Sequence, residues 1–155
     1  MAATFSQLKS SYPTKPKREF YNVLGGQWPS LIDNPNFQNT CAIRMSSAFL
    51  GAGISIPAQY KEAIDGSGNT IVLKVKTFKD FIVSQYGESS WGMSKPIGSV
   101  LASTDLPQKP GIIAYHADWA DASGHFDLWE TNKFVGTGNF DSIRDGFSIE
   151  MWFLE

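Results

Sequence analysis

Residues that carry covalent and metal chemistry are scarce in this sequence. Its 155 residues include one cysteine, Cys41, and two histidines, His116 and His125. A single cysteine excludes an intramolecular disulfide and a four-cysteine zinc site, and two histidines argue against a histidine-rich metal site. We therefore expect a protein with no metal and no other cofactor.

Long apolar segments and an excess of one charge are also missing. No stretch approaches the ~20 apolar residues that span a bilayer, and the N-terminus has no apolar signal-peptide core. The formal net charge is -2, and a solvated helix start explains the small basic cluster of Lys15, Lys17 and Arg18. These absences argue against membrane insertion, nucleic-acid binding and a signal peptide, so another machine must export the chain if it acts outside the cytoplasm.

What the sequence does contain is typical of a globular domain. Hydrophobic residues make up 42% and charged residues 18%, and the length suits a single domain over residues 1–155. Helical patterns come first along the chain and most strand patterns later, which predicts an α+β fold with an antiparallel sheet. Helices are predicted at 4–10, 16–24, 41–50 and 77–86, strands at 70–76, 111–116, 124–130 and 147–154, and a loop-rich stretch at 87–110.

Cys41 stands at the beginning of a predicted helix. In the segment CAIRMSSAFL, Met45 and Phe49 recur at helical spacing, and Asn39 or Thr40 is suited to cap the first turn. An isolated cysteine is most often a small buried hydrophobic residue. At a helix N-terminus, however, the helix dipole and the unpaired N–H groups favour the reactive thiolate and can stabilise an oxyanion.

His125 lies in a predicted strand with the sequence GHFDLWE. Strand alternation places His125, Asp127 and Trp129 on one face and the intervening residues on the face expected to point inward. The face with His125 is therefore expected to look toward a cleft or another layer. His116, at the end of the preceding predicted strand, is expected to be a surface or loop residue.

Together, Cys41 and His125 predict a cysteine hydrolase. A cysteine at a helix start facing a histidine on a central strand is the arrangement of papain-like enzymes. The histidine takes the thiol proton and returns it to the leaving amine. Asp127, on the same face and about 6.5–7 Å further along the strand, is a candidate to orient the imidazole.

Two motifs resemble those of the type VI secretion amidase effectors, in particular the fourth family. The first is FQNTCAIRMS at residues 37–46, in which Cys41 is followed by Arg44 and then by Met-Ser. The second is Gly-His-x-x-Leu-Trp at residues 124–129, preceded by a Gly-Ile-Ile strand at 111–113. Their order and spacing and the total length agree with the family, so the resemblance covers nearly the whole chain.

The resemblance implies a papain-like, NlpC-type fold in which the Cys41 helix packs on an antiparallel sheet. It implies a peptidoglycan amidase that cleaves the bond between D-glutamate and meso-diaminopimelate in the stem peptides of rival bacteria. Delivery by the secretion apparatus would bring the enzyme to the periplasm of the target without a signal peptide. The producer would carry a cognate immunity protein that blocks the site.

The third catalytic position stays open at this point. Some members of the resembled family place the orienting acid about a dozen residues after the histidine, but residues 131–140 contain no acid and Asp141 is the first. Either Asp127 or Asp141 takes the role, and we favour Asp127. Arg44, one helical turn after Cys41, is a candidate to bind a carboxylate of the acidic stem, and a structural salt bridge explains it equally well.

Two other functions are compatible with the sequence. One is a different papain-like wall hydrolase, such as a phage-type lysin. The other is a non-catalytic wall-binding module with exposed aromatic residues. Release of new amines from peptidoglycan, lost on replacing Cys41 by alanine, separates an enzyme from such a module.

Overall fold

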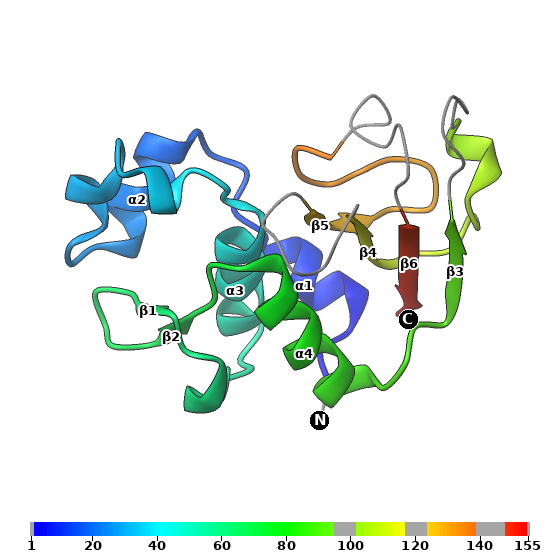
Figure 1. Ribbon diagram of the computed structural model, residues 1–155, viewed down its shortest axis with the longest axis horizontal. Coiled ribbons are helices and arrows are strands. Elements are labelled where there is room, and N and C mark those ends of the chain that lie inside the picture. Colours follow the sequence, from blue (N-terminus) through cyan, green and yellow to red (C-terminus); the bar gives the residue numbers. More distant parts are fainter. Residues whose placement is uncertain (1, 95–101, 117–123, 139–147, 155) are drawn as a thin grey trace.

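A computed structural model of the chain describes residues 2–94, 102–116, 124–138 and 148–154. Helices α1 (Phe5–Ser11), α3 (Cys41–Gly51) and α4 (Val75–Tyr86) lie between a four-stranded antiparallel sheet and a separate hairpin of two short strands, and helix α2 (Lys17–Leu24) lies on the side of the hairpin (Figure 1). This arrangement confirms the predicted α+β class, with the helix that bears Cys41 packed beside an antiparallel sheet.

Local sequence signals set the start of the first helix and the end of the second. At the start of the first helix, Thr4 Oγ1 accepts a hydrogen bond from Gln7 N and Gln7 Oε1 accepts one from Thr4 N, which is a capping box. The second helix ends at Gly25, whose φ of 74° is a left-handed conformation that glycine adopts without strain. The helices are α1 (Phe5–Ser11), α2 (Lys17–Leu24), α3 (Cys41–Gly51) and α4 (Val75–Tyr86), with 3₁₀ turns η1 (Trp28–Leu31), η2 (Pro35–Phe37), η3 (Ala58–Tyr60) and η4 (Ser103–Asp105).

Helix α3 is buried on nearly all sides. Every residue from Cys41 to Ser46 is buried, as are Ala48 and Phe49. The Ser46 hydroxyl donates to Ala42 O at 2.8 Å and accepts from Val72 N at 3.0 Å, which fastens the segment after the short hairpin to the helix. The helix that begins at Cys41 is therefore a fixed part of the core.

The sheet has the strand order β3–β6–β4–β5, with antiparallel pairing throughout. The central strand β4 places Ile113 opposite Asp127 of β5 on one side. On its outer side, β5 is flanked by the segment that follows it, because Val135 N donates to Leu128 O at 2.9 Å. The strands are β1 (Ala63–Ile64), β2 (Thr70–Ile71), β3 (Trp91–Ser94), β4 (Gly111–His116), β5 (His125–Trp129) and β6 (Ser148–Phe153).

Both faces of the sheet are covered. Phe126 and Leu128 of β5 belong to the larger hydrophobic cluster, which also contains the buried residues of α1, α3 and α4. Trp129 and Ile113 belong to a second cluster on the opposite side, closed by Leu106. The predicted alternation in β5 is confirmed for these residues, and the strand ends up between two apolar layers.

Only the first two residues of the strand predicted over 70–76 form a strand, β2. Helix α4 already begins at Val75, because Glu62 caps it from outside: Glu62 Oε1 accepts from the N–H groups of the two residues before Val75, each at 2.8 Å. Thr77, the predicted first residue of this helix, lies within its first turn and donates its hydroxyl to Glu62 Oε2 at 2.9 Å. A tertiary contact therefore sets the start of this helix.

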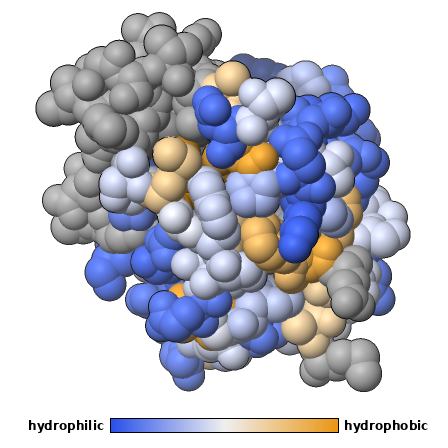
Figure 2. Space-filling view, turned by 90° about the vertical axis from the view of Figure 1, so that its right-hand side faces the viewer, coloured by the Kyte–Doolittle hydropathy of each residue, from blue (hydrophilic) through white to orange (hydrophobic). Residues whose placement is uncertain are grey.

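Strand β3 lies within the stretch predicted to be a loop. Its four residues pair with β6 at the outer edge of the sheet, and only alternate residues are half-buried. On the side of the molecule where this edge lies, hydrophobic residues surface in small areas among hydrophilic ones (Figure 2). In the described part of the chain, no helix is long and apolar enough to cross a membrane.

Candidate active site

Cys41 is the first residue of α3 and lies where that helix meets β5. The residue is 3% exposed, and Sγ is 4.0 Å from Gly124 O. The Cys41 N–H has no acceptor inside the helix and donates to Asn39 Oδ1 at 3.2 Å. Of the two predicted capping residues, Asn39 supplies this bond, while the Thr40 side chain does not cap the helix.

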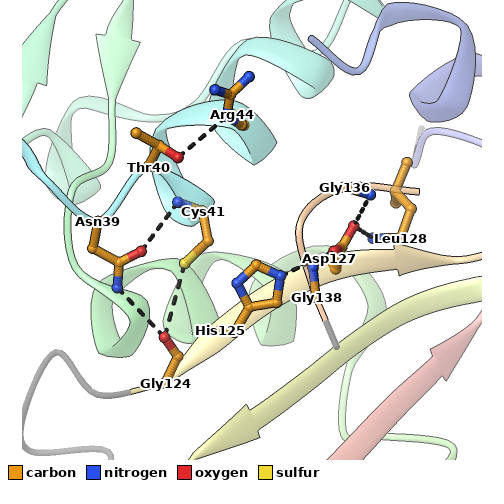
Figure 3. A network of polar contacts seen from close by, with 10 residues as sticks. All are labelled: Asn39, Thr40, Cys41, Arg44, Gly124, His125, Asp127, Leu128, Gly136 and Gly138. Carbon is orange, nitrogen blue, oxygen red and sulfur yellow. Dashed lines mark hydrogen bonds and ion pairs between the residues drawn. The ribbon is translucent and has the colours of Figure 1, made fainter. Parts of the chain in front are cut away.

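Asn39 also reaches the strand on the other side of the site. Its Nδ2 donates to Gly124 O at 3.4 Å, and Gly124 directly precedes His125 (Figure 3). One amide side chain therefore contacts both the first N–H of the Cys41 helix and the residue before the histidine. A shift of either element changes the Asn39 contacts.

His125 begins β5, and its imidazole lies between Cys41 and Asp127 with one ring nitrogen toward each (Figure 3). Nε2 donates to Asp127 Oδ2 at 2.9 Å. Burial by itself lowers the pKa of His125, but hydrogen bonds and charges of Asp127 and Cys41 together outweigh it and raise the pKa to about 9. The ring is therefore protonated at neutral pH and can donate a proton.

Asp127 is fully buried, and backbone groups hold its carboxylate. Oδ1 accepts from Leu128 N at 2.8 Å and from Gly136 N at 2.7 Å, while Oδ2 accepts from Gly138 N at 2.9 Å. With His125 as the fourth donor, the buried charge is fully hydrogen-bonded. These donors fix the direction in which the carboxylate meets the imidazole.

The role of the Gly136-Thr137-Gly138 segment was not predicted from the sequence. A Cβ on Gly136 would lie 2.8 Å from Asp127 Oδ1 and 2.3 Å from the Tyr12 hydroxyl, and one on Gly138 would lie 2.9 Å from Asp127 Oδ2. The absence of a side chain thus lets both N–H groups approach the carboxylate. The Gly-x-Gly spacing after the strand is a local signal, but it does not name the acid that it binds.

Tyr12 closes the site behind Gly136. Its hydroxyl is buried and forms no hydrogen bond with any described residue. Burial first, and then the nearby charges of Asp127 and Cys41, raise the pKa of Tyr12 above its usual range. The phenol therefore stays neutral beside the carboxylate.

Arg44 lies one turn into α3 and is 6% exposed. Its Nε donates to Thr40 Oγ1 at 3.1 Å, and Nη1 donates to the carbonyl oxygens of Pro13 at 2.9 Å and Lys15 at 2.8 Å. The guanidinium also lies 4.8 Å from the centre of the Phe20 ring. No described acidic residue forms a salt bridge with it, so the structural explanation takes the form of hydrogen bonds to the backbone.

The remaining candidates lie apart from Cys41, His125 and Asp127 or outside the described residues. His116 is not a surface or loop residue: it ends β4, is 8% exposed, and its Nε2 is 3.7 Å from Glu150 Oε2. Asp141 lies outside the described residues. Within the described ranges, no three His, Cys, Asp or Glu side chains come together in a group that could hold a metal ion.

A thiol, an imidazole and a buried carboxylate in this order can carry out acyl transfer. The protonated imidazole stabilises a thiolate beside it, and the carboxylate keeps the ring in one orientation. The arrangement brings together three of the predicted site residues, Cys41, His125 and Asp127. It leaves Arg44 behind the nucleophile, where it fastens the segment around Pro13 to the helix.

Comparison with known proteins gives one family and a set of similar structures. Residues 37–153 match the family described as type VI secretion system (T6SS), amidase effector protein 4, or Tae4. No curated protein matches the chain by sequence at a significant level.

Several solved structures share the fold over the whole chain. The type VI effector Tae4 from Enterobacter cloacae has a TM-score of 0.82 at 24% identity and covers 100% of this chain and 98% of its own. The Tae4–Tai4 effector–immunity complex from Enterobacter cloacae has a TM-score of 0.78 at 23% identity, with both chains covered at 100%. Tae4 from Salmonella typhimurium in complex with Tai4 from Enterobacter cloacae has a TM-score of 0.79 at 20% identity and 99% coverage of each chain.

Proposed function

The chain belongs to the Tae4 family of type VI secretion amidase effectors, and we propose on this basis that Cys41, His125 and Asp127 are its catalytic residues. The family makes it a peptidoglycan amidase effector. The observation that carries the residue assignment is the imidazole of His125 between the Cys41 thiol and the Asp127 carboxylate, with Nε2 2.9 Å from Oδ2.

In the first half of the reaction, the Cys41 thiolate attacks the carbonyl carbon of the stem-peptide amide. The carbonyl oxygen becomes negative, and N–H groups at the start of α3 are the donors available to stabilise it. The protonated His125 then gives its proton to the nitrogen, the carbon–nitrogen bond breaks, and the amine leaves. Cys41 is left as a thioester with the acyl part of the stem.

In the second half, the now neutral His125 accepts a proton from a water molecule as that water attacks the thioester carbonyl. The carbon–sulfur bond breaks, which releases the carboxylic acid and returns the thiolate beside a protonated imidazole. Asp127 accepts the Nε2–H bond throughout and keeps the other ring nitrogen directed at the reacting sulfur.

The bond that we propose is cleaved joins D-glutamate to meso-diaminopimelate, and the compartment is the periplasm of a target bacterium reached through the secretion apparatus. An immunity protein that covers the site would protect the producer. The solved complexes of Tae4 with Tai4 support this proposal, since they show relatives of this fold bound to such a protein.

The family assignment favours a secreted effector over the phage-type lysin considered from sequence. A wall-binding module without catalysis differs from the proposal in one measurable way. Purified meso-diaminopimelate peptidoglycan should release new amines with the natural chain and none above background with Cys41→Ala. Ser47→Ala, a half-buried change on the same helix, is the matched control and should digest at the normal rate.

Mass spectrometry of the released fragments identifies the bond. The proposal is supported if one product ends in D-glutamate and the other begins with diaminopimelate. Normal digestion by Cys41→Ala, with its circular dichroism and unfolding midpoint unchanged, would show that another residue is the nucleophile.

A further inference from the structure

A groove of about 670 Å³ lies between η2 and the start of α4. Asn39 is part of its wall, and the Oδ1 of that residue accepts the Cys41 N–H. The volume is in the range of small-ligand sites, and through Asn39 the groove wall contacts the residue that we propose as the nucleophile.

The groove wall combines apolar and polar side chains. Phe37 and Leu73 supply apolar surface, and Asn36 and Asn39 supply amides. Such a wall suits a peptide, which needs apolar contact area and a few hydrogen-bonding groups.

Two charged residues face this groove, and they are not equally available. Glu62 has both carboxylate oxygens occupied, by the N–H groups of Leu73 and Lys74 and by the Thr77 hydroxyl. The Glu62 carboxylate is therefore already engaged at the start of α4. Lys74 uses its backbone N–H in the same cap, but its side chain is exposed and forms no ion pair with any described acidic residue.

We propose that this groove binds the stem peptide on one side of the scissile bond and that the Lys74 ammonium pairs with a carboxylate of the stem. The inference rests on the proposed function, since it takes Cys41, which Asn39 of the groove wall contacts, as the nucleophile. The chemistry is that of an acidic peptide: an ammonium without an internal partner, in a groove with amide donors, selects an anionic group over a neutral one. Two carboxylates flank the bond, one on D-glutamate and one on diaminopimelate, and either can be the partner.

The test measures binding without cleavage, in the Cys41→Ala background, by calorimetry with synthetic stem peptides. Lys74→Ala should weaken binding of the natural peptide about two- to fivefold, the value of one exposed ion pair. A peptide with a carboxamide in place of the partner carboxylate should bind the Lys74-containing protein with a similar loss. The two losses should not add when combined, because they remove the same contact.

Two carboxamide peptides, one altered at D-glutamate and one at diaminopimelate, identify which carboxylate is involved. Lys74→Arg should retain most of the affinity. Lys76→Ala is the control, since Lys76 is an exposed neighbour that pairs with Asp80 at 3.7 Å and does not line the groove. The proposal is overturned if the loss of affinity in Lys74→Ala adds fully to the loss caused by each carboxamide peptide. It is also overturned if Lys74→Ala binds the natural peptide with unchanged affinity. Cleavage of peptidoglycan by the natural chain is scored separately, so the catalytic assignment can stand when the groove assignment fails.

Discussion

His125 has Asp127 on one side of its ring and Cys41 on the other, and different parts of the chain hold the two sides. Asp127 is fully buried, and three backbone N–H groups and the imidazole surround its carboxylate. On the opposite side, the N–H of Cys41 donates to the side chain of Asn39, an exposed residue in the wall of a groove.

The difference follows from what each side has to do. A backbone cradle has no side-chain rotamers, so once the fold has ordered these residues it holds the carboxylate in one direction. The nucleophile side must admit a substrate, and a side-chain hydrogen bond at the surface can give way when a carbonyl oxygen arrives. The closed side therefore fixes the imidazole, and on the open side the Asn39 side chain can release the Cys41 N–H to a substrate carbonyl.

Breaking the closed side at its centre should give the largest effect. Asp127→Asn puts an NH₂ group among three N–H donors, so the side chain can neither accept all of them nor fix the ring. We expect turnover to fall about a thousandfold, measured as amine release from peptidoglycan. Asp141→Asn should cost far less, and the reverse ranking of the two variants would move the orienting role to Asp141.

The pH dependence of the free energy of unfolding reports how strongly Asp127 and Cys41 act on His125. The pKa of His125 is raised from 6.5 to about 9, so this residue contributes stability that is fully present below pH 6.5 and is lost as the pH rises through 9. The free energy of unfolding should fall by about 2–3 kcal/mol between pH 6.5 and 10, measured by denaturant titration against a His125→Gln baseline.

The hydrogen bond to Asp127 is the largest single interaction that raises this pKa. Asp127→Asn should therefore flatten the pH dependence more than Cys41→Ala does. Equal flattening by the two variants would mean that the two sides contribute alike.

A smaller disturbance of the closed side is an added methyl group. Gly136→Ala forces a Cβ to within 2.8 Å of the Asp127 carboxylate, so the acid must move away from its donors. We expect kcat to fall about 10- to 100-fold and the free energy of unfolding to fall by about 1–3 kcal/mol. Gly92→Ala on edge strand β3, where the nearest atom is 3.4 Å from the new Cβ, should change neither by much, and normal kcat in Gly136→Ala would argue against the cradle.

The open side should respond least. Asn39→Ala removes the contacts to Cys41 N and Gly124 O, and we expect turnover and the rate of Cys41 alkylation by iodoacetamide to fall together, each about tenfold. Asn39→Asp keeps an acceptor for Cys41 N and should fall less in alkylation. Asn22→Ala, an exposed change on α2, is the control; a loss of turnover alone would assign Asn39 to oxyanion stabilisation instead of positioning.

Much of the nucleophile region could be predicted from the sequence because its signals are local. Helical spacing after Cys41 and a capping residue just before it predict the start of α3. The period of two in β5 predicts which residues of that strand share a face. Each of these signals lies within a few residues of the position that it determines. Asp127 could be proposed from the sequence for the same reason, since it is two residues from His125 on a strand. The structure supports this choice with the 2.9 Å contact between their side chains.

The tertiary structure alone decided the contacts between segments that are far apart in the chain. Glu62 starts α4 from another segment, and Gly136 and Gly138 place their N–H groups on Asp127 only because the chain turns back along β5. Neither partner carries a local pattern that names the other, because hydrogen bonds to backbone N–H groups impose little on residue type beyond the absence of a clashing side chain. The sequence by itself determined which helix and strand present the thiol and the imidazole, and the fold decided how the carboxylate behind them is held.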